Sequence, residues 1–132
     1  MKLYDILLDN EKIGTTELEK ADAAMGVIFG RINFVDIKSG YDFFKDYCLK
    51  NTIDIITEYE EEKLISTANI PHLVVTDENG TEIKGLASNI EGMDSDIFEV
   101  IISGIPYPYF EEKFPHHVKT YKDQFKIDND SK

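Results

Sequence analysis

The chain has 132 residues, of which 42% are hydrophobic, and this is sufficient for one domain with a substantial core. Its 26 acidic and 14 basic residues give a formal charge of −12. A charge of this sign disfavours binding to nucleic acid and to anionic membranes, because both repel a negative surface. With no signal peptide, no apolar run of membrane-spanning length and Cys48 as its single cysteine, the chain is expected to be a soluble cytoplasmic protein.

The negative charge is distributed unevenly along the chain. Residues 1–63 contain 14 acids and 8 bases, whereas residues 64–112 contain nine acids and one base. Residues 113–132 reverse the sign, with three acids and five bases. The long segment poor in bases favours a basic partner, although acidity for solubility alone is the alternative.

The first 37 residues predict β-structure. Residues 1–19 indicate a hairpin that turns at Asp9-Asn10-Glu11. Residues 25–37, MGVIFGRINFVDI, predict a single strand in which Gly26 and Gly30 mark bulges or close backbone approaches.

Residues 39–51, SGYDFFKDYCLKN, predict the main helix. Ser39 is placed to cap it, Asp42 follows three residues later, and Asn51 is a plausible stop. Phe43, Phe44, Tyr47 and Cys48 recur at helical spacing, so Cys48 is expected to be a buried apolar residue rather than a nucleophile.

The middle of the chain predicts further antiparallel strands. Residues 52–70 indicate two strands about the acidic run at 58–62, and residues 72–85 indicate a hairpin with Asn79-Gly80 in its turn. Residues 91–99 are interpreted as a solvated acidic loop or a contact loop for a basic partner, and residues 96–105 as a strand. These elements predict an α+β fold with a mostly antiparallel sheet built from hairpins.

The segment GIPYPYFEEKFPHHVKTY, residues 104–121, combines prolines, aromatic residues and histidines. Pro106 and Pro108 predict an extended exit from the last strand, and Pro115 suits the start of a C-terminal helix over about 116–125. Val118, Tyr121 and Phe125 share one face of that helix. The aromatic residues of the segment are expected to pack against the domain, with a protein interface as the alternative; residues 1–126 then form one domain and 127–132 a frayed tail.

His116 and His117 raise the possibility of a metal site. Adjacent side chains diverge on a strand or helix, so both rarely reach one ion, and no third histidine lies nearby in the sequence. Arg31, the single arginine, is expected to be a buried organiser of acidic neighbours. The chain has no phosphate-binding, nucleotide-binding or hydrolase motif.

Two segments carry a family resemblance. In residues 16–32, TELEKADAAMGVIFGRI, the Leu-Glu pair, the Ala/Asp stretch, Met-Gly-Val and the Gly-Arg pair resemble small bacterial proteins, as does the segment 104–118. Proteins of this type look like immunity proteins of bacterial toxin systems. The resemblance implies stoichiometric binding of a toxin and supplies no catalytic residue.

The resulting hypothesis is an acidic binding protein, not an enzyme, that neutralises a basic toxin domain, with a nuclease as one candidate class. No cofactor or metal is expected. The alternatives are a small metal-assisted or acid/base enzyme that uses His116, His117 and nearby carboxylates, and a subunit of an oligomer. The expected partner contacts are carboxylates and tyrosines, which steer and anchor protein association: Glu58, Glu60, Glu61, Glu62, Asp94, Asp96, Tyr107, Tyr109, Glu111 and Glu112.

Overall fold

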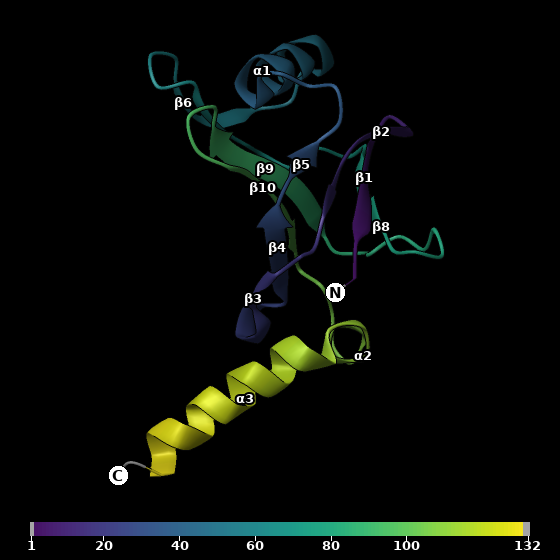
Figure 1. Cartoon of the computed structure of the whole chain (residues 1–132), viewed down its shortest axis with the longest axis vertical. Helices are drawn as coiled ribbons and strands as arrows, with labels where there is room; N and C mark the ends of the chain where they lie inside the picture. The colour runs from purple at the N-terminus through teal and green to yellow at the C-terminus, as the bar shows by residue number, and fades with distance from the viewer. Residues whose placement is uncertain (1, 131–132) are drawn as a thin grey trace.

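The computed structural model describes residues 2–130, which form two antiparallel β-sheets and three α-helices (Figure 1) and confirm the predicted α+β class. The smaller sheet, in the order β5-β2-β1-β8, consists of β1 (Tyr4–Leu8), β2 (Glu11–Thr16), β5 (Asn33–Phe34) and β8 (Leu73–Thr76). The larger sheet, in the order β3-β4-β10-β9-β7-β6, consists of β3 (Lys20–Asp22), β4 (Val27–Arg31), β6 (Ile55–Tyr59), β7 (Leu64–Thr67), β9 (Ala87–Met93) and β10 (Phe98–Ser103). The helices are α1 (Gly40–Asn51), α2 (Tyr109–Lys113) and α3 (Pro115–Asp130).

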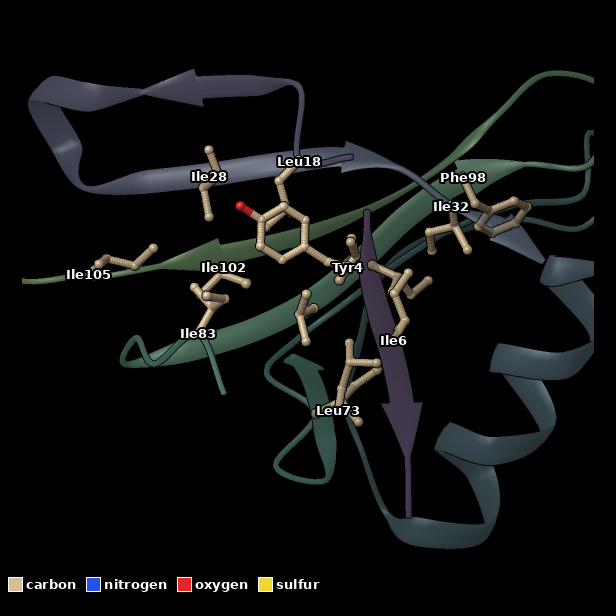
Figure 2. Close-up of a cluster of buried hydrophobic side chains, with 14 of the residues drawn as sticks. Tyr4, Ile6, Leu18, Ile28, Ile32, Leu73, Ile83, Phe98, Ile102 and Ile105 are labelled. Carbon is tan, nitrogen blue, oxygen red and sulfur yellow. The ribbon is translucent and has the colours of Figure 1, made fainter. Parts of the chain in front are cut away.

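The two sheets share one hydrophobic core, which Figure 2 shows in part. Ile6 of β1 and Leu73 of β8 come from the smaller sheet, and Ile28, Phe98 and Ile102 come from the larger one. All five are at most 4% exposed. Their burial removes apolar surface from water and is the main force that holds the sheets together.

The predicted N-terminal hairpin is present. Strands β1 and β2 pair antiparallel from Tyr4 opposite Thr16 to Leu8 opposite Glu11. Asp9 and Asn10 connect them with φ values of 51° and 69°. Two consecutive left-handed residues give the backbone twist that a two-residue hairpin turn requires, and Asn and Asp tolerate this conformation better than most residues do.

The prediction of one continuous strand over residues 25–37 is wrong. The segment forms β4 in the larger sheet and β5 in the smaller one. Between them the backbone N–H of Ile32 donates to the carbonyl of Phe98 at 2.8 Å, while Val35 donates to Ile13 at 2.9 Å. The chain therefore crosses from one sheet to the other at Ile32, whose buried side chain anchors the crossing.

The predicted close approach at Gly30 is confirmed. A Cβ atom there would lie 2.5 Å from Thr16 Oγ1 and 2.8 Å from the Cα atom of Leu18. The next residue, Arg31, is exposed, so the prediction of a buried arginine is wrong. Alternation along β4 explains this, because Ile28 and Gly30 face the core and Arg31 faces outward.

The main helix is found where it was predicted. The backbone N–H of Asp42 donates to Ser39 Oγ at 3.0 Å, which confirms the cap, and Thr52 in the left-handed region ends the helix one residue beyond Asn51. Phe44 and Cys48 are buried, and burial raises the pKa of the Cys48 thiol to about 11. The expected apolar role of Cys48 is therefore confirmed.

The central region departs from the prediction in two places. Residues 81–84 make an isolated bridge and a hydrogen bond from Ile83 to Val75 (2.8 Å), but they are not a strand, so the hairpin over 72–85 is only half formed. Residues 87–93 form the unpredicted strand β9, and Glu99 belongs to β10. Only residues 94–97 of the predicted acidic loop are a turn.

The tail is more helical than predicted. Helix α2 replaces much of the expected extended exit after β10, and its carbonyl acceptors include Pro106 and Pro108. Helix α3 begins at Pro115, as predicted, and continues to Asp130, beyond the predicted end at about residue 125. Residues 131–132, and the side chains of residues 125–130 with Phe125 among them, lie outside what the structure describes. No helix within residues 2–130 is long and apolar enough to cross a bilayer.

Candidate protein-binding surface

Two turns bring six of the predicted contact residues to the end of the molecule that carries α1. Glu58 lies near the end of β6, Glu60, Glu61 and Glu62 occupy the turn from β6 to β7, and Asp94 and Asp96 lie in the turn from β9 to β10. The two turns are neighbours, because the backbone N–H of Asp94 donates to the carbonyl of Lys63 at 3.2 Å. We call these six carboxylates the acidic end.

Glu58 is committed to contacts within the fold. Its carboxylate accepts a hydrogen bond from the Tyr41 hydroxyl and pairs with Lys45 Nζ at 2.8 Å. The bond from Lys45, reinforced by that from Tyr41, lowers the pKa of Glu58, and the same pairing raises the pKa of Lys45. Glu58 therefore joins β6 to α1 in addition to contributing negative charge.

Asp94 also has a structural role, at the start of α1. Its carboxylate accepts hydrogen bonds from the backbone N–H of Tyr41 at 3.0 Å and from the Ser39 hydroxyl. The first N–H groups of a helix have no partner within the helix, and a carboxylate there also interacts favourably with the helix dipole. Asp94 and Ser39 therefore cap α1 together.

The other four carboxylates of the acidic end are exposed to solvent. Among the described side chains, those of residues 2–124, none forms an ion pair or a side-chain hydrogen bond with Glu60, Glu61, Glu62 or Asp96. The nearest lysine along the chain, Lys63, lies 4.0 Å from Asp42 instead. These four side chains keep their charge available to a partner.

A hollow of about 440 Å³ adjoins the acidic end, on the face of the larger sheet that turns away from α1. Leu64, Met93 and Ile97 supply apolar surface, and the carboxylates of Glu91, Asp96 and Glu99 lie in its lining. Glu91 and Glu99 face each other directly across β9 and β10, an arrangement that costs energy between like charges. Lys20 offsets part of it by pairing with Glu99 at 2.9 Å.

The remaining predicted contacts lie far from the acidic end, on the segment that leads into α2 and on α2 itself (Figure 1). The Tyr107 hydroxyl donates to the carbonyl of Ala23 at 2.8 Å, and that of half-buried Tyr109 donates to the carbonyl of Glu82 at 3.3 Å. Glu111 and Glu112 are exposed, with Glu111 Oε1 3.7 Å from Lys122 Nζ. The structure thus separates the ten predicted residues into two groups, and the tyrosines hold the tail against the sheets.

The histidines of the tail line a second cleft, of about 420 Å³, between α3 and the N-terminal strands. His117 Nε2 lies 3.0 Å from the carbonyl oxygen of Leu18, so this imidazole bonds to backbone. Burial lowers the pKa of His116, assisted by the nearby His117 and Lys2. Among residues 2–124, whose side chains the structure describes, no three His, Cys, Asp or Glu side chains gather closely enough to hold one metal ion.

Asp96 of the hollow was among the predicted contacts, and Glu91 and Glu99 lie in the predicted contact loop, but the apolar residues Leu64, Met93 and Ile97 were missed, in part because β9 was not predicted. Its sequence, ASNIEGM, contains one β-branched residue and a glycine, which gives a weak strand signal. The signal that could have predicted β9 is alternation along the strand. Asn89, Glu91 and Met93 recur at every second position and face away from the core, whereas Ile90 between them is buried.

Comparisons with protein-family models, with curated proteins and with solved structures gave no match.

Proposed function

We propose that this chain is a binding protein whose acidic end receives a cationic protein partner. The observation that carries the proposal is the group of four exposed, unpaired carboxylates, Glu60, Glu61, Glu62 and Asp96, beside a hollow with an apolar lining. Charged groups without partners can bind a basic surface without breaking an ion pair of their own, and apolar surface beside them gives an area from which contact can expel water.

The overall charge supports the same proposal. A net charge of −12 accelerates encounter with a basic partner, and short-range contacts then determine how long the complex lasts. The resemblance of residues 16–32 and 104–118 to immunity proteins makes a bacterial toxin domain the proposed partner, with nucleases as one basic class. In this proposal the protein acts in the cytoplasm by stoichiometric occupation of the toxin and performs no catalytic step.

The roles proposed for the predicted contacts differ between the two groups. Glu60, Glu61, Glu62 and Asp96 contact the partner directly, whereas Glu58 and Asp94 hold the surface in place through α1. Tyr107 and Tyr109 have hydroxyl groups that already donate to backbone carbonyls, so the tail is assigned to stability rather than to binding.

Affinity capture from the native host with two matched variants tests the proposal. The triple variant Glu60→Gln/Glu61→Gln/Glu62→Gln removes three charges from the acidic end, and Glu111→Gln/Glu112→Gln removes two from α2. We expect the wild type and the α2 variant to retain a basic protein, and calorimetry with that purified protein to show the triple variant at least about tenfold weaker. Equal affinities for all three proteins, or a complex indifferent to salt, would contradict the proposal.

A further inference from the structure

The two sheets have four edge strands, and these differ in how well they are protected. Strands β5 and β3 contain two and three residues, too few to offer a long pairing surface. The outer side of β8 is occupied by residues 81–84, because Ile83 donates to Val75 at 2.8 Å and Thr76 bridges to Glu82. Strand β6, with five residues, is therefore the longest edge left open within residues 2–130.

The backbone of β6 has hydrogen-bond partners on one side. It pairs with β7 from Ile55 opposite Thr67 to Tyr59 opposite Leu64, with an irregularity between Ile55 and Thr57. Within the described chain, residues 55–59 make no other backbone hydrogen bond. Alternate N–H and C=O groups of a strand point to its two sides, so the outer side of β6 presents donors and acceptors over about 17 Å.

Exposed apolar side chains accompany this open edge. Ile56 is 67% exposed and Tyr59 is 58% exposed, although both residue types are usually buried in strands. Leu49, 68% exposed, follows Tyr41 and Lys45 at four-residue spacing on α1, the stripe that contacts Glu58 of β6. Backbone groups and apolar side chains are thus available together.

The charges around β6 determine which occupant fits it. Glu60, Glu61 and Glu62 follow the strand and form no ion pair with the side chains that the structure describes, and the nearby Lys45 is already paired with Glu58 at 2.8 Å. A second copy of this chain would bring only more unpaired carboxylates and no free base to this edge, in addition to the repulsion between two bodies of charge −12. A cationic strand instead places its lysines or arginines beside these acids.

From this we infer that the partner binds by adding a strand to the β6 edge, through an extended segment that alternates basic and apolar residues. The inference rests on the function proposed above and specifies how the partner is recognised. Main-chain hydrogen bonds supply the register, Tyr59 packs against the apolar residues on its face of the added strand, and the glutamates bind the basic ones.

A pair of synthetic probes tests the inference on the unaltered full chain. The first is an eight-residue peptide of alternating arginine and valine. The second is the peptoid with the same side chains, which lacks every backbone N–H donor. We expect the peptide to bind at least about tenfold more tightly than the peptoid and to slow hydrogen exchange of the β6 amides.

The other outcomes separate this inference from the proposed function. Strand addition would be overturned if the two probes bound equally and left hydrogen exchange in β6 unchanged. If the variant Glu60→Gln/Glu61→Gln/Glu62→Gln then bound neither probe, the acidic end would remain a cation-binding surface. No binding by either probe would overturn strand addition, and the capture of a basic protein from the native host would then decide the proposed function by itself. If hydrogen exchange of the β6 amides slowed as the protein concentration rose, without any probe, a second copy of the chain would be the occupant. That result would also overturn the inference.

Discussion

At the scale of single residues, carboxylates in similar sequence contexts have different roles in the structure. Glu58 and Glu60 are two positions apart in one acidic run, yet Glu58 pairs with Lys45 at 2.8 Å and accepts from Tyr41, whereas Glu60 is exposed and unpaired within residues 2–130. Strand alternation explains the difference for Glu58, because its side chain turns toward α1. The acidic run in the sequence predicts negative charge. Which groups each carboxylate contacts depends on the face of the strand or turn on which it lies.

Replacement of Glu58 by glutamine is expected to make stability less sensitive to acid. The folded state lowers the pKa of Glu58, chiefly through the bond from Lys45, so its contribution is present above the ordinary value of about 4.5 and is lost as pH falls through the lowered value. The wild type should therefore exceed Glu58→Gln in stability at pH 7, and the difference should shrink below pH 4.5. Urea unfolding of both proteins across this range measures it. A difference that is constant with pH would contradict the assignment of the lowered pKa to this pair.

At the scale of elements, helix α1 is capped from two places in the chain. Ser39 Oγ accepts from the N–H of Asp42 at 3.0 Å, and the Asp94 carboxylate accepts from the N–H of Tyr41 at 3.0 Å and from the Ser39 hydroxyl. The Ser39 cap follows from local sequence, whereas the Asp94 contact spans more than fifty residues. A contact at that separation depends on the pairing of β9 with β10 and β7, which positions the turn.

The two capping residues are expected to be energetically coupled. Ser39→Ala should cost about 1 kcal/mol of the free energy of unfolding, the usual value for a lost N-terminal cap. Asp94→Ala should also destabilise the protein, and the double variant should lose less than the sum of the two single losses because the residues share a hydrogen bond. Thermal and urea unfolding of the four proteins give the coupling. Additive losses would show that Asp94 and Ser39 act independently.

The same distinction between local and distant contacts determines how much of the fold could be predicted. The hairpin at Asp9-Asn10, the helix capped by Ser39 and the burial of Cys48 depend on turn chemistry, capping and helical spacing, and all three predictions are confirmed. The change of sheet at Ile32 was missed because the segment is continuously strand-forming. Strand β9 was missed because its β-propensity is low, and pairing with β7 and β10 compensates for that.

The candidate site was predictable in composition and not in arrangement. The excess of acids over residues 64–112 led to the prediction of a basic partner, but only Asp94 and Asp96 of the acidic end lie in that segment. The tertiary fold places Asp96 beside Glu91 and Leu64 in one hollow. It also places Tyr107 at the other end of the molecule, where its hydroxyl donates to the carbonyl of Ala23. The sequence interpretation placed the acids and the tyrosines on one surface, because their separation in space cannot be inferred from their positions in the chain.

At the scale of the whole molecule, salt is expected to act in opposite directions on stability and on binding. The chain carries −12, so its carboxylates repel one another in the compact state, and raising salt from about 0.1 M to about 1 M shortens the screening length from about 10 Å to about 3 Å. The melting temperature of the free protein should therefore rise over this range. Binding to the arginine–valine peptide should weaken over the same range, because there the screened interaction is attractive.

The triple variant Glu60→Gln/Glu61→Gln/Glu62→Gln tests the effect of charge on stability and its effect on binding in one protein. These side chains repel their neighbours and have no base paired with them within residues 2–130, so their neutralisation should leave the melting temperature unchanged or higher and reduce its dependence on salt. The same change should weaken peptide binding and flatten its salt dependence. Calorimetry and thermal melts at matched salt concentrations measure both. A variant that melts lower than the wild type at low salt would mean that the glutamates stabilise the fold, and their availability to a partner would then have no support.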